Sequence, residues 1–291
     1  MKLTGVMPAL VTPFDDKGKI DFNRFEKLLH KLRDDGVKGW VPCGSTGEYN
    51  ALTMDERASV LKFVANFANK DELLIAGTNA GSTWEVIEHT RRARELGYTA
   101  VLLSAPFYAT PAPDELIAHY RSVLDAVDVE LVLYNYPPKV GVEVGLEVLE
   151  AFKDDKRVIG IKESSGNLLR AIDIRSRFGD RYQLTNGSDD QTLDFFLWGA
   201  TSWICGPANC MARACVDLVN TIESGNWLAA RDKMQVIYGA MASLESGKFV
   251  QKVKYGCELA GTPVGVGREP LLPLTTGEKA AFRKAMEPVL G

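Results

Sequence analysis

A lysine and a tyrosine stand at the ends of two apolar, β-branched runs, where their side chains could act on a carbonyl compound. Lys162 ends the run 157–162 (RVIGIK), and Tyr134 ends the run 130–134 (ELVLY). A lysine at a strand end commonly reaches solvent, with its aliphatic stem laid over apolar neighbours. If this end is buried instead, desolvation lowers the pKa of the amine, and a neutral amine can attack a carbonyl carbon to form a Schiff base. A tyrosine beside it could then transfer protons.

Strand parity predicts that these two side chains meet. Side chains alternate between the two faces of a strand, so Val132 shares a face with Tyr134, and Val158 and Gly160 share a face with Lys162. If both faces point toward the interior, the phenol and the amine lie on neighbouring strands. We expect Gly160 to leave room for the lysine. For Tyr134 alone, an ordinary core aromatic is the simpler interpretation.

A turn rich in glycine and hydroxyl groups, Gly44-Ser45-Thr46-Gly47-Glu48, follows the apolar run 38–42. Glycines permit a tight turn whose backbone N–H groups stay open to an anion. The Ser45 hydroxyl could relay protons from Tyr134, and Tyr108 after the run 99–103 could continue that relay. A Ser/Thr turn that merely caps the next helix would look the same.

The elements that must position these groups alternate along the chain. Short apolar runs predict strands at 5–11, 38–42, 73–76, 99–103, 130–134, 157–162, 181–185 and 201–205. Helical periodicity predicts helices at 22–34, 53–69, 83–96, 113–126, 145–152, 167–178, 189–199 and 208–223. Thr53 and Glu56 form a capping-box pattern at one helix start. Beyond residue 223 the pattern predicts helices only, at 226–244, 247–260 and 276–289.

Eight strand–helix units predict a (β/α)8 barrel, a TIM barrel of the α/β class, over residues 1–223, with a C-terminal helical extension over 224–291. An open doubly wound sheet is the alternative, but no glycine-rich nucleotide fingerprint follows the first strand. Active sites of such barrels lie at the C-terminal ends of the strands. Lys162, Tyr134 and the Ser45 turn all fall at such ends.

Other chemistries have weaker support in the sequence. His30, His89 and His119 fall inside predicted helices, so neither an imidazole metal site nor a Ser-His-Asp triad is indicated, and we expect no metal and no cofactor. Asp189 and Asp190 could hold magnesium, but a pair of acids at a helix start is more simply a complement to the helix dipole.

Composition favours a small-molecule ligand. The 291 residues are 46% hydrophobic, with a net charge of −4 and no basic stripe, so neither nucleic acid nor a membrane is an expected partner. The five cysteines are sparse and form no C-x-x-C pair, which suits reduced thiols and a cytoplasmic location. The sequence shows neither a signal-like segment nor an apolar stretch long enough to span a membrane.

Taken together and in order, the motifs GSTGE, PFY, YNYP, GIKES, NGSDD and GA resemble the dihydrodipicolinate synthase / N-acetylneuraminate lyase family. That resemblance implies a (β/α)8 fold and an imine between Lys162 and pyruvate or another 2-keto acid. It implies general acid/base work by Tyr134 and proton relay through Ser45 to Tyr108. The family places that last tyrosine in a neighbouring subunit's site, which implies a homo-oligomer built as a dimer of dimers. The substrate-binding residues that it implies are Gly44, Thr46 and Gly47 with Ser45 at the carboxylate, Ile204 beside pyruvate, and Gly187 and Lys139 near the second substrate.

Members of this family differ in the second substrate, and Lys139 bears on that difference. Synthases of the family carry an arginine here that binds the aldehyde's carboxylate. A lysine keeps the charge but loses the two-pronged geometry of arginine. The GSTGE turn is also closer to the form in sialic-acid lyases. Residues at the positions where some synthases bind inhibitory lysine are different, so we expect no such inhibition; these are Tyr49, Asn50, Met54, Arg57 and Phe107.

Three functions follow from the resemblance. We favour condensation of pyruvate with an aldehyde such as aspartate semialdehyde, by a 4-hydroxy-tetrahydrodipicolinate synthase-like lyase. The alternative is retro-aldol cleavage of a 2-keto-3-deoxy sugar acid, N-acetylneuraminate or 4-hydroxy-2-oxoglutarate to pyruvate and an aldehyde. A third is a regulator that binds a 2-keto acid without turnover, against which the intact lysine, tyrosine and serine set argues.

Overall fold

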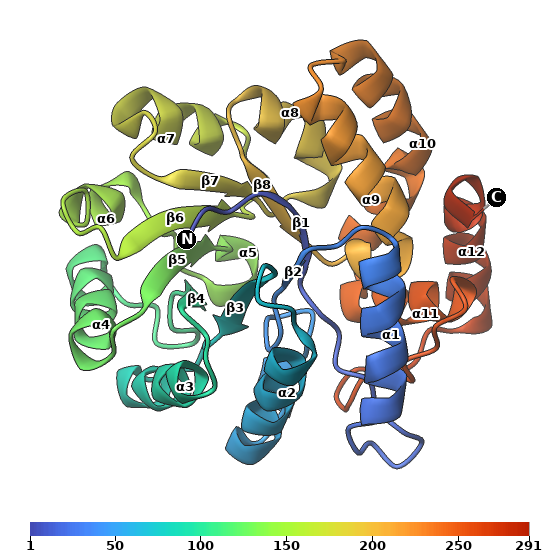
Figure 1. The fold of residues 1–291 in the computed structure, drawn as a ribbon, viewed down its shortest axis with the longest axis horizontal. Helices are drawn as coiled ribbons and strands as arrows, with labels where there is room; N and C mark the ends of the chain where they lie inside the picture. Colours follow the sequence, from blue (N-terminus) through green and yellow to red (C-terminus); the bar gives the residue numbers. More distant parts are fainter. Residues whose placement is uncertain (291) are drawn as a thin grey trace.

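A computed structural model describes residues 1–290 of the chain, and it is built on alternating strands and helices (Figure 1). The strands are β1 (Gly5–Pro8), β2 (Gly39–Trp40), β3 (Leu73–Gly77), β4 (Ala100–Ser104), β5 (Glu130–Asn135), β6 (Val158–Glu163), β7 (Gln183–Asn186) and β8 (Ser202–Cys205). The helices around them are α1 (Phe22–Asp34), α2 (Met54–Phe67), α3 (Thr83–Glu95), α4 (Pro113–Ala126), α5 (Pro137–Val140), α6 (Leu146–Ala151), α7 (Leu169–Phe178), α8 (Thr192–Leu197) and α9 (Ala208–Glu223). Two short 3-10 turns are η1 (Tyr49–Ala51) and η2 (Asp189–Gln191).

The strands form one parallel sheet that curves into a barrel. Their order is β1-β8-β7-β6-β5-β4-β3-β2, and a parallel bridge between Ala9 and Val41 joins the two ends of that order. In Figure 1 the helices encircle the strands, and the N-terminus lies near the barrel axis. The predicted TIM barrel is confirmed.

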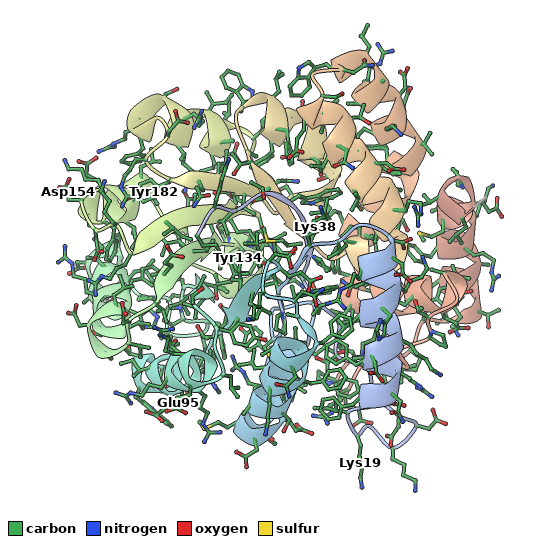
Figure 2. All side chains as sticks on the ribbon, viewed as in Figure 1. Lys19, Lys38, Glu95, Tyr134, Asp154 and Tyr182 are labelled. Atoms are coloured by element: carbon green, nitrogen blue, oxygen red, sulfur yellow. The ribbon has the colours of Figure 1, made fainter. Side chains whose placement is uncertain are left out.

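The barrel encloses its own apolar core. Its inner cluster includes Leu3, Met7, Ala9, Val41, Ile75, Ala100, Leu102, Val132, Tyr134, Ile159 and Ile204. A larger cluster fills the layer between the strands and the surrounding helices. Tyr134 lies near the middle of the barrel, while charged side chains such as Glu95 and Asp154 lie at its periphery (Figure 2). Burial on both faces explains why strands such as β3 and β4 are almost entirely apolar.

Local signals correctly located most of the elements. The capping box at α2 forms as expected, with Thr53 and Glu56 each accepting a hydrogen bond from the other's backbone N–H. The predicted strands β1 and β2 are shorter than their apolar runs, and the region 189–199 is split between η2 and α8. Helix α5 was not predicted, because its four residues are too few to show a period.

Three further helices follow α9: α10 (Trp227–Glu245), α11 (Phe249–Leu259) and α12 (Thr276–Leu290). They pack on one another, α10 and α11 also pack on α9, and α10 contacts η2 at the end of β7. Helix α10 therefore lies beside the end of β7, whereas α12 lies at the outer edge of the molecule (Figure 1). None of the helices described in residues 1–290 is long and apolar enough to cross a membrane.

Candidate active site

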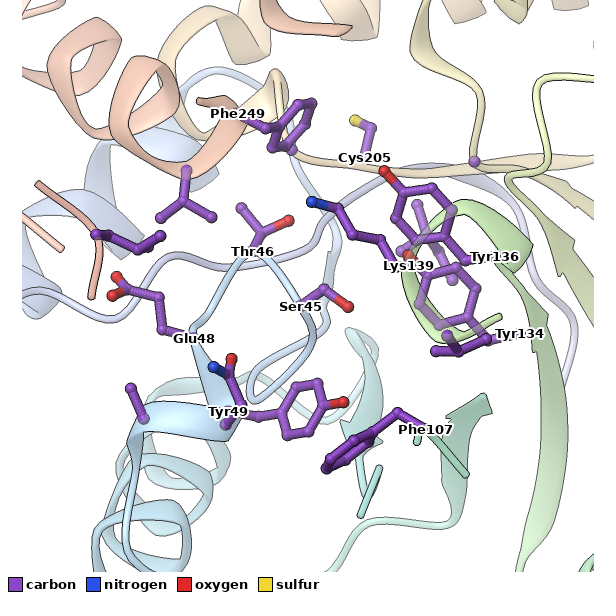
Figure 3. Close-up of a pocket in the computed structure, with 18 of the residues that line it drawn as sticks. Ser45, Thr46, Glu48, Tyr49, Phe107, Tyr134, Tyr136, Lys139, Cys205 and Phe249 are labelled. Carbon is purple, nitrogen blue, oxygen red and sulfur yellow. The ribbon is translucent and has the colours of Figure 1, made fainter. Parts of the chain in front are cut away.

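A cavity of about 410 Å³ opens at the C-terminal ends of the strands. Residues from the turn after β2, from β5 with α5, from β6, and from the ends of β7 and β8 line it, and α10, α11 and residues 268–271 close its outer side. Of the sequence-predicted site residues, it contains Ser45, Thr46, Tyr134, Lys139, Lys162, Gly187 and Ile204. Figure 3 shows several of these side chains converging on one space.

Lys162 and Tyr134 are direct neighbours on adjacent strands. The two residues are in register between β5 and β6, and the Lys162 Nζ atom lies 4.5 Å from the centre of the Tyr134 ring. Both side chains are buried, with exposures of 6% for Lys162 and 4% for Tyr134. The predicted meeting of the amine and the phenol at the barrel mouth is therefore present.

The environment of Lys162 makes its ammonium easier to deprotonate. Burial lowers the pKa of Lys162 from 10.5 to about 8, although electrostatic interactions, the largest with Asp189, act in the opposite direction. Near neutral pH such an amine has a far larger uncharged fraction than an exposed lysine. This is the property that attack on a carbonyl carbon requires.

Tyr134 is held as a neutral phenol. Burial raises the pKa of Tyr134, while the hydroxyl groups of Ser45 and Ser164 counter part of that effect. In Figure 3 the Ser45 side chain faces Tyr134 across the cavity. A neutral phenol beside a second hydroxyl can donate one proton while accepting another, which is the chemistry of a proton relay.

Strand parity in β6 differs from the prediction in one respect. Leu131 pairs with Val158, but Val132 pairs with Gly160, so a bulge interrupts the register between them. Val158 therefore belongs to the outer apolar layer, whereas Ile159 belongs to the inner one. The expectation that Val158 shares the inward face with Lys162 is wrong, because the bulge inserts one residue into the alternation.

A different glycine makes room for the lysine. A Cβ atom on Gly160 would lie 2.4 Å from the backbone oxygen of Gln183, so Gly160 allows close approach of β7 rather than space for Lys162. A Cβ atom on Gly187 would lie 2.7 Å from Cε of Lys162 and 1.9 Å from Oγ of Ser164. Gly187 is therefore the residue whose missing side chain admits the lysine.

The turn after β2 presents unused donors to the cavity. The N–H groups of Gly47 and Glu48 bond to the carbonyls of Gly44 and Ser45 within the turn, whereas those of Ser45 and Thr46 donate to no group in residues 1–290. Ser45 and Thr46 line the cavity, while Gly44 and Gly47 shape the turn behind it. Gly47 must lack a side chain, because a Cβ atom there would lie 2.7 Å from the Leu10 carbonyl oxygen. Two free N–H groups and two hydroxyls suit a small carboxylate.

A buried ion pair fixes this turn to the C-terminal helices, and sequence reasoning missed it. Nζ of Lys254, in α11, lies 2.6 Å from Oε1 of Glu48, and both side chains are almost fully buried. The same ammonium donates to the Thr12 carbonyl, and the Thr12 hydroxyl donates to the Gly47 carbonyl. Glu48 has a left-handed backbone with φ of 57°, which a non-glycine residue seldom adopts without support. Glu48 in the GSTGE motif was a visible signal, but nothing in the sequence pointed to Lys254.

Asp189 is the second residue that sequence reasoning undervalued. It lines the cavity with 2% exposure and accepts a 2.9 Å hydrogen bond from the Trp203 indole N–H. Burial and the charge of Glu245 raise the pKa of Asp189, which Lys162 opposes. Its place directly after β7 could have suggested a site residue, in addition to a helix start. Within residues 1–290, no three His, Cys, Asp or Glu side chains gather as a metal site would require.

Tyr108 lies apart from the other predicted residues. Its side chain is 96% exposed, it does not line the cavity, and its φ is 71°. The histidines at 30, 89 and 119 lie in α1, α3 and α4 and also stay outside the cavity wall. Lys139, by contrast, extends from α5 into the cavity between Thr46 and Cys205 (Figure 3).

Known proteins resemble this chain in sequence and architecture over nearly their whole length. Residues 2–288 match the dihydrodipicolinate synthetase family. The 4-hydroxy-tetrahydrodipicolinate synthases of Methanothrix thermoacetophila and Geobacter sulfurreducens are each 33% identical over 97% of this chain, covering 95% and 97% of their own lengths.

Solved structures agree. The chloride-inhibited dihydrodipicolinate synthase of Acinetobacter baumannii, complexed with pyruvate, has a TM-score of 0.95 and 29% identity over 99% of each chain. The 4-hydroxy-tetrahydrodipicolinate synthase of Methylacidiphilum fumariolicum has a TM-score of 0.95 and 27% identity over 99% of this chain and 96% of its own. With a family match over almost every residue, the same barrel and a buried lysine at its mouth, this chain belongs to the dihydrodipicolinate synthetase family of lyases.

Proposed function

We propose that the protein forms an imine between Lys162 and the keto carbon of pyruvate, and adds the resulting enamine to an aldehyde such as aspartate semialdehyde. The observation that supports this most strongly is the buried Lys162 amine, with a pKa of about 8, beside the Tyr134 phenol. Relatives named 4-hydroxy-tetrahydrodipicolinate synthase and a similar structure that holds pyruvate support the same choice of substrates.

The first half of the reaction follows from the positions of these groups. The neutral Lys162 amine adds to the keto carbon, and the carbinolamine loses water to give the imine. Tyr134 supplies the proton that the departing hydroxide needs and, as the phenolate, takes up the proton later lost from the methyl carbon, with Ser45 as the neighbouring hydroxyl of the relay. Meanwhile the free N–H groups of Ser45 and Thr46 bind the pyruvate carboxylate, and Ile204 packs beside its methyl group.

Loss of a proton from the pyruvate methyl carbon then gives the enamine. Its terminal carbon attacks the aldehyde carbon, the aldehyde oxygen takes a proton, and water releases the product from Lys162. Gly187 and Lys139 border the space that the aldehyde would occupy. In this role the Lys139 ammonium binds a carboxylate of the aldehyde as a single point charge.

Cleavage of a larger 2-keto acid is the second candidate, and it uses the same steps in reverse. The observation that favours it is Lys139 itself, because a lysine fixes a carboxylate less strictly than arginine. Candidate substrates are a 2-keto-3-deoxy sugar acid, N-acetylneuraminate and 4-hydroxy-2-oxoglutarate. A Lys139→Arg variant, assayed with aldehydes and keto acids in both directions, separates the two: stronger preference for carboxylate-bearing aldehydes supports condensation.

Tyr108 is proposed to complete the site of a neighbouring subunit in a dimer of dimers. Its nearly full exposure and its left-handed backbone suit a side chain held ready for a partner. Mixing Tyr108→Phe subunits with Lys162→Ala subunits tests this: a dimer with one intact site should recover activity that neither variant has alone.

A cytoplasmic location is also proposed for the protein, supported by five buried free cysteines. We further propose residues 1–223 and 224–291 as the catalytic barrel and its helical extension.

Trapping the imine tests the central proposal. The protein is incubated with pyruvate, reduced with borohydride and analysed by intact mass and peptide mapping. The expected result is one pyruvate-derived adduct per chain, located on Lys162. An unmodified chain, or an adduct on another lysine, would contradict the mechanism.

A further inference from the structure

We infer that Glu245 is a specificity residue of this cavity, and that its carboxylate receives an ammonium group on the second substrate. The inference rests on the proposed function and narrows it, because it selects aldehydes that carry both an ammonium and a carboxylate. In this arrangement Lys139 binds the carboxylate and Glu245 binds the ammonium.

Three of the seven charged side chains that line the cavity have polar side-chain partners within the described residues. Glu48 is paired with Lys254, Arg268 is paired with Glu56, and Asp189 accepts the Trp203 indole N–H. In contrast, Lys139, Lys162, Glu245 and Glu269 take part in no ion pair in the part of the chain that the structure describes. The cavity therefore offers unpaired charges of both signs near its opening.

Glu245 has the position that an ammonium partner requires. It is the last residue of α10, which packs against η2 at the end of β7, and it lines the cavity. Burial and the charge of Asp190 raise the pKa of Glu245, whereas the charges of Lys162 and Lys139 and the backbone N–H of Asp189 lower it. The carboxylate thus lies within electrostatic range of the imine lysine and of the carboxylate-binding lysine.

The charge balance explains why such a residue would be needed. An ammonium that enters the cavity near Lys139 is repelled by that charge unless an anion faces it. A neutral polyhydroxylated aldehyde carries no ammonium, so it would not need an anion in this place. A carboxylate that lines the same cavity as Lys139 and forms no ion pair with it therefore fits an amino-acid-like aldehyde better than a sugar.

Two unreactive analogues differ only in this ammonium group. L-homoserine carries an ammonium, a carboxylate and a terminal hydroxyl, and 4-hydroxybutyrate lacks the ammonium alone. Binding of each to the intact protein, with pyruvate present, can be measured by calorimetry. We expect homoserine to bind about tenfold more tightly, and Glu245→Gln to remove that difference while leaving 4-hydroxybutyrate almost unchanged.

Glu269→Gln is the matched variant, because Glu269 also borders the cavity but is not assigned this role. Equal binding of the two analogues by the unmodified protein would overturn the inference. So would a preference that survives Glu245→Gln, or one that Glu269→Gln removes instead. Imine trapping distinguishes this failure from failure of the proposed function: trapping on Lys162 without a homoserine preference refutes only the role of Glu245.

Discussion

Nζ of Lys162 lies 4.5 Å from the centre of the Tyr134 ring, and the two residues face each other in register across β5 and β6. The face of an aromatic ring attracts an ammonium, whereas burial without a salt bridge penalises it. Here burial is the larger effect, since the pKa of Lys162 falls to about 8. The phenol ring thus holds the amine in place without keeping it fully charged.

Imine formation should depend on pH through this amine. Only the neutral form attacks, so the rate of adduct formation with pyruvate should fall about tenfold per pH unit below the Lys162 pKa of about 8 and level off above it. The measurement is the initial rate of borohydride-trapped adduct across a pH series. A rate that keeps rising toward the pKa of an ordinary lysine would show that the amine is not perturbed, and Lys162→Arg should give no adduct at all.

Removal of the Tyr134 hydroxyl should slow proton transfer without preventing pyruvate binding. We expect Tyr134→Phe to lower kcat by about 10²–10⁴-fold, the usual contribution of a positioned acid/base group. Exchange of the pyruvate methyl protons with deuterated water, followed by NMR, should slow in parallel. Tyr136 is the control, since its ring lies 5.7 Å from that of Tyr134 and borders the same cavity. If Tyr136→Phe costs as much as Tyr134→Phe, the specific role of Tyr134 is refuted.

A methyl group at position 187 should displace the lysine. In Gly187→Ala the new Cβ atom would overlap Oγ of Ser164 and press on Cε of Lys162, so the amine must move. We expect adduct formation to slow by more than about tenfold, since small misplacements of reacting groups have large effects on rate. Gly239→Ala in α10 is the control, because a Cβ atom there meets nothing within 4 Å. Unchanged trapping in Gly187→Ala would show that the lysine adapts.

The Glu48–Lys254 pair should couple stability to carboxylate binding. Lys254→Met leaves a buried carboxylate without its partner, which typically costs about 3–5 kcal/mol of unfolding free energy. In the remaining folded protein the turn should loosen, so that KM for pyruvate rises more than kcat falls. The control is Lys248→Met, which breaks an exposed pair with Glu278 near the start of α11. Denaturant unfolding and steady-state kinetics measure the two effects, and the double variant Glu48→Gln, Lys254→Met should regain part of the stability if charge is the cause.

Features of the fold could be predicted from the sequence where the signal lies within one short segment, and not where it depends on contacts between distant segments. Alternating apolar runs and the Thr53 capping box are local, and they predicted the barrel and most of its elements. The bulge before Gly160 is not local, because it belongs to the pairing of β6 with β5, and it changed which residues share a face with Lys162. Gly160 and Lys162 still share one face of β6, because the bulge lies before both residues.

The candidate site shows the same division. Lys162, Tyr134 and the Ser45 turn could be selected because each follows a strand and carries reactive groups. Lys254 could not, since 206 residues separate it from Glu48 and an isolated lysine in a helix has no pattern of its own. Asp189 was visible but ambiguous, because an acid at a helix start has a simpler explanation.

The inner core of the barrel is one apolar cluster that includes both Leu3 and Tyr134, so Tyr134 and its neighbour Lys162 adjoin the same packed column that stabilises the fold. Changes there must satisfy packing and chemistry together. The groups proposed to select the aldehyde come instead from separate surface elements: Lys139 from α5 and Glu245 from the end of α10. Evolution or a protein engineer could therefore exchange one aldehyde for another at this rim, residue by residue, while the chemistry that activates pyruvate stays intact.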